Sequence, residues 1–187
     1  MQTAGISVLM ADTGERARAI QHWSDLGILH AQADTDRKGR GRYREYAVEP
    51  YFGERKWALI ASALNKLRIP LGDMRSIVDV MRQHGGPVLN DTGISKRSAI
   101  NKFEVSFFYQ SLIGNGDVLC LIAIAESKMR IRLCFTPAIR AEILSPPRNV
   151  EFDPSAEFIL RMIHEFVAEH ESSYCLNLTK VFAPLRG

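Results

Sequence analysis

The side chains best suited to chemistry in this sequence form a short basic stretch in its first half. Five cations fall within eight positions, with glycines between some of them: Arg37, Lys38, Arg40, Arg42 and Arg44. Because glycine favours turns, the stretch is predicted to be a loop or hairpin rather than a helix. Arg and Lys in such a hairpin can bind phosphate oxygens. The alternative is a solvated loop that binds nothing.

A second polar set precedes this stretch, in a predicted helix over residues 14–25. Ala17, Ile20 and Trp23 recur at helical spacing on its apolar side. Its opposite side carries Arg18, Gln21, His22 and Asp25. Arg and Gln can hydrogen-bond to the edges of guanine and adenine in the major groove. The candidate DNA-binding residues are therefore Arg16, Arg18, Gln21, His22, Arg37, Lys38, Arg40, Arg42, Tyr43 and Arg44.

Charge and composition narrow the class of protein. The chain is 46% hydrophobic and 24% charged, which excludes a mostly disordered protein. Its whole net charge of +3 lies in residues 1–84, since residues 85–187 hold equal numbers of basic and acidic side chains. No run of ~18 apolar residues is present, so no membrane contact is expected. The first residues do not form a secretory signal, so we expect a cytoplasmic, nucleoid-associated protein.

The polar sets need elements that position them. A short helix and a Thr13–Gly14 turn precede helix 14–25, and apolar spacing predicts further helices over 54–67 and from Pro70. His84–Pro87, with two glycines and a proline, predicts the end of the last helix. The predicted organisation is a DNA-binding domain over 1–84, a linker over 85–97, and an α+β domain over 98–187.

Three segments of the first domain resemble the winged helix-turn-helix of MerR-type transcriptional regulators. They are the Thr13–Gly14 turn with Ile20–Leu29, the wing segment Tyr43–Tyr46, and the helix connection Leu67–Met74, all in family order. The resemblance implies a regulator that binds double-stranded DNA as a homodimer. The family's dimerising coiled coil is not carried over, because Gly85–Pro87 is predicted to interrupt the helix that would form it.

The second half predicts an antiparallel sheet with a packed helix. Residues 117–125 are almost all apolar and 128–136 alternate, which is typical of a hairpin. Matching the apolar faces pairs Ile122 with Ile131, Ile124 with Met129, and Cys120 with Leu133. Alternating apolar residues over 103–109 predict a preceding strand, with a helix through 98–112 as the alternative. A helix beginning near Asp153 and a final strand through Val181–Phe182 complete the predicted domain. We expect this domain to mediate dimerisation or to receive a signal from an effector or protein partner.

No feature of the sequence indicates catalysis. Cys120, Cys134 and Cys175 are too scattered for a disulfide framework, and they lack metal-site spacing. Phosphate-loop and nucleophile motifs are also missing. We therefore expect no enzyme activity, no metal and no cofactor.

The combined interpretation is a sequence-specific DNA-binding transcriptional regulator of α+β fold. One alternative is an architectural or recombination-directionality factor, which would also use a small winged domain. Another is an adaptor or ligand-sensing protein that acts through its C-terminal sheet. Binding focused on promoters would separate the first interpretation from an architectural factor.

Overall fold

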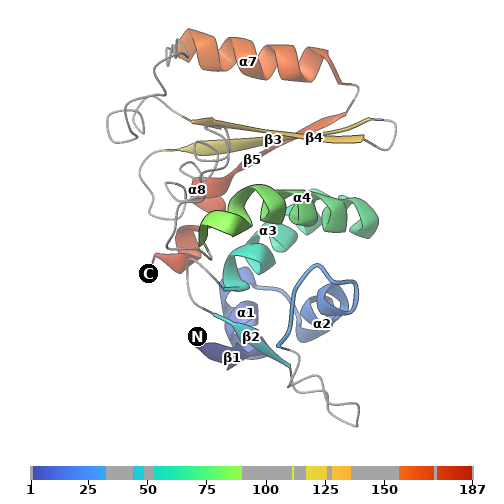
Figure 1. Ribbon diagram of the computed structural model, residues 1–187, viewed down its shortest axis with the longest axis vertical. Coiled ribbons are helices and arrows are strands. Elements are labelled where there is room, and N and C mark those ends of the chain that lie inside the picture. Colours follow the sequence, from blue (N-terminus) through green and yellow to red (C-terminus); the bar gives the residue numbers. More distant parts are fainter. Residues whose placement is uncertain are drawn as a thin grey trace. The chain divides into compact units, whose positions relative to one another are not determined.

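The structure is a computed structural model that describes residues 2–32, 44–48, 53–89, 111, 117–125, 128–135, 156–170 and 172–186. Helices and two small antiparallel sheets in these residues make the protein α+β, as predicted (Figure 1). The chain divides into two compact units, residues 1–90 and 91–186. Each unit is described by itself below.

The first unit begins with two short helices joined by a tight turn. Helix α1 spans Ile6–Thr13, and Gly14 ends it in the left-handed conformation with φ 71°. The hydroxyl of Thr13 bonds to the Leu9 carbonyl within α1. The Glu15 N–H in turn donates to Thr13 Oγ1 at 3.1 Å, within the turn that residues 14–16 form. Helix α2 begins at Ala17 rather than at residue 14.

Helix α2 (Ala17–Asp25) has the two faces that its spacing predicts. Ile20 is fully buried and Trp23 is 2% exposed, so these side chains anchor the helix in the core. Arg18, Gln21 and His22 are exposed on the other side. Burial of the apolar face thus fixes which polar side chains face solvent.

Two strands close this unit beside α2. β1 (Thr3–Gly5) pairs antiparallel with β2 (Glu45–Ala47). The backbone N–H of Gln32 donates to the Glu45 carbonyl at 2.9 Å. The chain therefore leaves toward the basic stretch and returns from it at neighbouring points, while residues 33–43 lie outside the described part.

Helices α3 (Arg55–Lys66) and α4 (Leu71–Leu89) complete the first unit. Trp57, Ile60 and Leu64 on α3 and Met74 and Ile77 on α4 are buried, as helical spacing predicts. Leu67, the last residue of the helix predicted over 54–67, is instead 42% exposed. These helices and α1 enclose the core on which α2 rests.

The predicted helix end at residue 84 is wrong, because α4 continues to Leu89. Each glycine lowers helix stability by only ~1 kcal/mol relative to alanine, so Gly85 and Gly86 weaken the helix without ending it. Pro87 has no backbone N–H to donate to the carbonyl of residue 83, so it removes one hydrogen bond from the last turn, yet the helix continues two residues beyond it. Residues 85–89 of the predicted linker are therefore helical. The boundary between the two units falls between residues 90 and 91.

The second unit contains a three-stranded antiparallel sheet. β3 (Val118–Ala125) pairs with β4 (Lys128–Phe135) in the predicted register, with Ile122 opposite Ile131 and Cys120 opposite Leu133. Residues 126–127, which connect them, lie outside the described part. Matching the apolar faces is therefore sufficient to fix the register of this hairpin.

The last strand lies earlier than predicted. β5 (Ser173–Asn177) pairs with the other edge of β3 and gives the order β4-β3-β5. The Asn177 side chain accepts a hydrogen bond from the Lys180 N–H at 3.1 Å and caps helix α8 (Leu178–Val181). The predicted strand through Val181–Phe182 is therefore wrong, since this cap begins a helix. A 3₁₀ turn over Ala183–Leu185 follows.

Helix α7 (Ala156–Ala168) covers one face of this sheet (Figure 1). Phe166 packs with Leu121 and Ala123, and Ile163 lies against the same cluster. Val167, which follows Phe166 on the same helix, is 49% exposed. The strand predicted over 103–109 and the cap predicted at Asp153 lie outside the described residues.

No helix in the described part of the chain is both long and apolar enough to cross a membrane.

Candidate nucleic-acid interface

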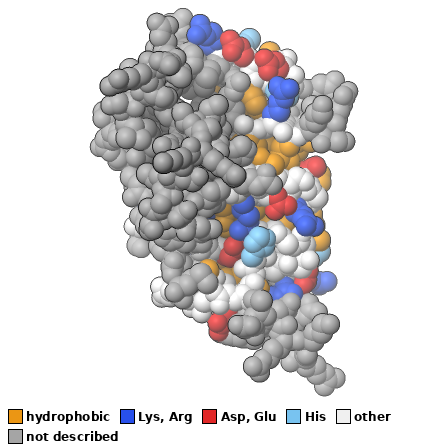
Figure 2. Space-filling model, viewed as in Figure 1, with side chains coloured by type: hydrophobic (Ala, Val, Ile, Leu, Met, Phe, Trp, Pro, Cys, Tyr) orange, Lys and Arg blue, Asp and Glu red, His pale blue; other side chains and the backbone are white. Residues whose placement is uncertain are grey.

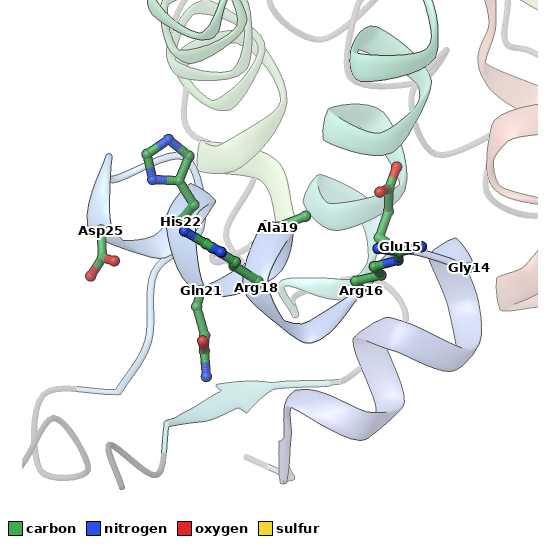
Figure 3. Close-up of a pocket in the computed structure, with 8 residues that line it drawn as sticks. All are labelled: Gly14, Glu15, Arg16, Arg18, Ala19, Gln21, His22 and Asp25. Atoms are coloured by element: carbon green, nitrogen blue, oxygen red, sulfur yellow. The ribbon is translucent and has the colours of Figure 1, made fainter. Parts of the chain in front are cut away.

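The exposed face of α2 and the turn before it bring together four of the predicted DNA-binding residues. Arg16, Arg18, Gln21 and His22 are all exposed, and together they line an open hollow of about 770 Å³. Figure 3 shows the side chains spreading from the helix, with Gln21 and His22 extending to different sides. None of the four side chains forms a hydrogen bond or ion pair in the described part of the chain. Their polar groups are therefore available to a ligand.

Side chains of α3 hold the turn before α2 in place by hydrogen bonds. Glu15 accepts hydrogen bonds from Ser62 at 3.0 Å and from Asn65 at 3.3 Å, both on α3. Ser62 also contacts the Thr13 carbonyl at 3.4 Å. These bonds attach the turn to α3, so the start of α2 is held in place without using the polar side chains on its exposed face.

Arg44 connects the end of the basic stretch to α2. Its Nη2 donates to Asp25 Oδ1 at 2.7 Å, and its Nη1 donates to the Gln21 carbonyl at 3.1 Å. The side chain is 8% exposed, whereas that of Asp25 is 50% exposed. A buried guanidinium with these partners favours a positioning role over the phosphate contact expected from the sequence. The positive charge of Arg44 also compensates the negative charge of Asp25, the last residue of α2.

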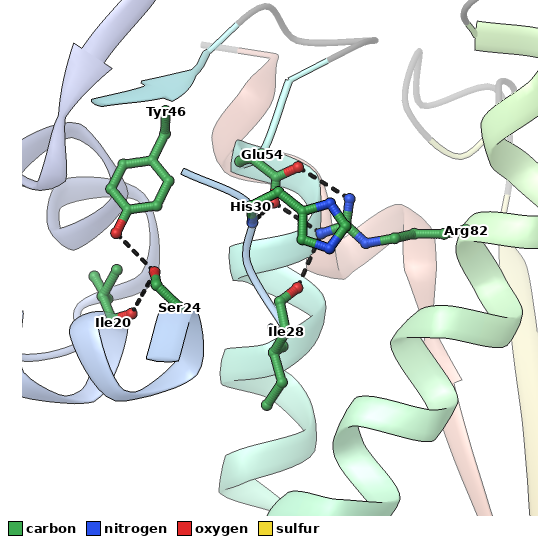
Figure 4. A network of polar contacts seen from close by, with 7 residues as sticks. All are labelled: Ile20, Ser24, Ile28, His30, Tyr46, Glu54 and Arg82. Atoms are coloured by element: carbon green, nitrogen blue, oxygen red, sulfur yellow. Dashed lines mark hydrogen bonds and ion pairs between the residues drawn. The ribbon is translucent and has the colours of Figure 1, made fainter. Parts of the chain in front are cut away.

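A hydrogen bond between Tyr46 of β2 and Ser24 of α2 also connects these elements, and no sequence pattern predicted it. Tyr46 is fully buried, and its hydroxyl lies 2.7 Å from Ser24 Oγ, which donates to the Ile20 carbonyl (Figure 4). Burial raises the pKa of the Tyr46 hydroxyl, so it remains a neutral hydrogen-bonding group. These contacts support a role for Tyr46 in packing β2 against the helices rather than in contacting phosphate.

The remaining predicted contacts fall outside the described residues. They are Arg37, Lys38, Arg40, Arg42 and Tyr43. The two chain ends that bracket them are described and lie close together, at Gln32 and Arg44–Glu45. The described flanking residues thus lie near the C-terminal end of α2, where Arg44 bonds to Asp25, and the individual contacts of the five undescribed residues stay predictions.

Charged side chains of both signs share the described surface. Figure 2 shows basic, acidic and histidine side chains close together on the described part of one face.

The three cysteines belong to the second unit. Cys120 is buried in β3, and Cys134 of β4 pairs in the register with Leu119 rather than with Cys120. Cys175 is exposed, and partial burial raises the pKa of its thiol. Within the described ranges, no three His, Cys, Asp or Glu side chains gather as metal ligands would.

Comparison with known proteins adds no assignment. No sequence model of a known protein family matches the chain, and no curated protein matches it either. The resemblance to MerR-type regulators therefore rests on the segments quoted from the sequence.

Proposed function

We propose that the chain is a sequence-specific, double-stranded DNA-binding transcriptional regulator. The first unit would be a winged helix-turn-helix of MerR-like type, with α2 in the major groove and the basic stretch on the phosphates. The observation that carries the proposal is the α2 face, where Arg16, Arg18, Gln21 and His22 project without partners among the described residues.

The chemistry of this face suits base edges better than a catalytic role. Arg forms two hydrogen bonds to guanine, and Gln forms two to adenine, so each can distinguish one base pair from the others. The helix is short and rigidly backed by Ile20 and Trp23, which are buried. Such a rigid backing keeps the side chains of Arg18 and Gln21 at a fixed spacing, as base readout requires.

The second unit is proposed to make the protein a dimer or to receive a signal. One helix-turn-helix offers few base contacts, so two copies on a palindromic site are the natural route to specificity. This part of the proposal keeps the homodimer and the unidentified effector expected from the sequence. The location that it implies is the nucleoid.

Selection from a random duplex library tests the DNA-binding proposal. Full-length protein should enrich a defined motif, and genome-wide pull-down should place that motif at promoters. Arg18→Ala should weaken binding to the motif, while Arg130→Ala, which removes an exposed arginine from β4 in the second unit, should not. Array-like coating of any duplex would favour an architectural factor, and the absence of duplex binding would favour an adaptor.

A further inference from the structure

Two consecutive carbonyl groups of α2 are held, directly or through Ser24, by side chains of the segment that contains β2. Ser24 Oγ donates to the Ile20 carbonyl at 3.0 Å, and the hydroxyl of Tyr46 lies 2.7 Å from Ser24 Oγ (Figure 4). Arg44 Nη1 donates to the Gln21 carbonyl at 3.1 Å. These carbonyls belong to the peptide groups immediately before and after the Cα atom of Gln21. The backbone that carries the Gln21 side chain is therefore held on both sides.

The direction of the hydrogen bonds at Ser24 follows from its single hydroxyl proton. Since Ser24 donates that proton to the Ile20 carbonyl, the hydroxyl of Tyr46 must donate to Ser24 Oγ. Tyr46 is fully buried, so water does not replace Ser24 as its partner. Tyr46, Ser24 and Ile20 therefore form a directed chain of hydrogen bonds from β2 to α2, and loss of either hydroxyl breaks it.

These bonds orient the helix rather than complete it. Within an α-helix, a carbonyl already accepts a hydrogen bond from the N–H four residues later. The carbonyls of Ile20 and Gln21 lie inside α2, so the bonds from side chains occupy their second lone pairs. The helix does not need these additional bonds to form, but they fix how it is rotated toward β2.

The chain that follows α2 is held by a different group of side chains. Arg82 Nη2 donates to the Ile28 carbonyl at 2.9 Å, and Arg82 forms two hydrogen bonds to the Glu54 carboxylate, at 2.9 and 2.8 Å. Glu54 Oε2 also accepts a hydrogen bond from the His30 N–H at 3.0 Å. These bonds fix the path of the chain beyond the helix, whereas the contacts from the β2 segment act on the helix itself.

The start of α2 is held by α3 instead. Glu15, in the turn before α2, accepts hydrogen bonds from Ser62 and Asn65 on α3. Arg18 lies in the first turn of the helix, and Gln21 lies one turn later. Loss of a contact from the β2 segment should therefore displace Gln21 more than Arg18.

We propose that Tyr46 and Arg44 position Gln21 so that its amide reads one adenine in the major groove. The Gln21 side chain is exposed, lines the open hollow and extends from α2 (Figure 3). Two hydrogen bonds from one amide to adenine require a defined orientation, which a fixed backbone supplies. Gln21 is then a specificity-determining residue, and Tyr46 and Arg44 are positioning residues that touch no DNA. This inference rests on the proposed function and names an A·T pair as the part of the duplex that this turn selects.

The test measures discrimination at single base pairs by the full-length protein, as the affinity for the selected duplex divided by that for a duplex with one pair changed. Gln21→Ala should remove the discrimination at one A·T pair, which for a bidentate contact is ~5- to 150-fold. Tyr46→Phe keeps the ring and removes only the hydroxyl. It should lower the discrimination at the same pair by ~2- to 10-fold, the effect of one hydrogen bond, without changing the salt dependence of binding.

Ser62→Ala is the matched control, because it also removes one hydroxyl that supports α2, but at the start of the helix. It should keep the wild-type discrimination at the pair that Gln21 reads. Tyr46→Phe added to Gln21→Ala should cause no further loss at that pair, since Tyr46 acts through Gln21. Ser24→Ala breaks the same chain of hydrogen bonds, so it should reproduce the effect of Tyr46→Phe, and it takes its place if that variant does not fold.

The outcomes separate this inference from the proposed function. If Gln21→Ala loses discrimination at one pair while Tyr46→Phe and Ser24→Ala keep it there, the positioning role is overturned and sequence reading by α2 stands. An equal loss at that pair in Ser62→Ala would also overturn it, because the effect would then be general loosening of the helix. If Gln21→Ala keeps the discrimination at every pair while Arg18→Ala lowers it at one, the role of Gln21 is overturned and the proposed function stands. If the wild type discriminates at no pair, the proposed function fails and this inference fails with it.

Discussion

Arg44 Nη2 lies 2.7 Å from Asp25 Oδ1, so the last cation of the basic stretch is bonded to the last residue of α2. Its Nη1 holds the Gln21 carbonyl of the same helix. The two parts proposed to contact DNA therefore share a direct connection. Movement of one relative to the other requires this connection to break.

Replacing Arg44 should destabilise the first unit. Arg44→Met leaves the Gln21 carbonyl without this donor and removes a buried charged hydrogen bond, which should lower the free energy of unfolding by ~1–3 kcal/mol. Urea denaturation of the full chain measures this. Arg18→Met is the control, because Arg18 is exposed, and it should change stability by less than ~0.5 kcal/mol. Equal effects from both changes would contradict a positioning role for Arg44.

Arg42 should act on affinity rather than on sequence choice. Arg42→Ala removes one predicted phosphate contact, so it should weaken binding to all duplexes similarly and reduce the salt slope by ~0.9. Titrations at several salt concentrations on the preferred and a scrambled duplex measure both quantities. Weakening restricted to the preferred duplex would instead make Arg42 a base-reading residue.

Because of Lys56, the free energy of unfolding should change with pH in the alkaline range. It is 2% exposed, and burial lowers the pKa of its ammonium to about 8. The charged form is thus disfavoured in the folded state, and between pH 8 and the ordinary pKa of 10.5 the unfolded chain binds more protons. Stability from this group should rise with pH across that window.

The comparison with Lys56→Met isolates the contribution of this lysine. The methionine variant should be the more stable at pH 7, and the difference should shrink as the pH rises from 8 toward 10.5. Denaturation of both proteins at matched pH values checks this. A constant difference across the window would show that Lys56 does not titrate there.

The second unit should carry the dimer contact. Leu160 is 66% exposed and Val167 49% exposed, and both belong to α7, away from the buried Phe166. Changing both residues to glutamate should leave the fold intact, since neither is in the core, and should yield a monomer if this surface is used. Sedimentation of the full chain measures it. If the glutamate variant stays dimeric and keeps the wild-type circular dichroism spectrum, the dimer contact does not involve Leu160 and Val167.

Local patterns predicted much of this fold. The apolar alternation of 117–125 and 128–136 was enough for the register of β3 and β4, because one slipped residue would reverse every side chain. The two faces of α2 followed from spacing in the same way. Both cases depend only on which side of a regular element is apolar.

Other features depend on contacts between residues far apart in the sequence, which the spacing of apolar residues does not predict. Arg44 belongs to a run of cations, and only the fold shows that it turns inward to Asp25. Glu54 and Arg82 are far apart in sequence, so no local pattern pairs them. The end of α4 also differs from the prediction, because Gly85, Gly86 and Pro87 lower the stability of the helix without ending it before Leu89.

The affinity ratio between the selected duplex and a scrambled duplex, at one salt concentration, tests the central proposal most directly. Wild-type protein should prefer the selected duplex by at least ~10³-fold, as specific DNA-binding proteins do. Arg18→Ala should cost ~1–3 kcal/mol on the selected duplex and much less on the scrambled one. Arg130→Ala should leave the ratio unchanged. Equal affinity of the wild type for both duplexes, or equal weakening on both in Arg18→Ala, would contradict sequence reading by α2.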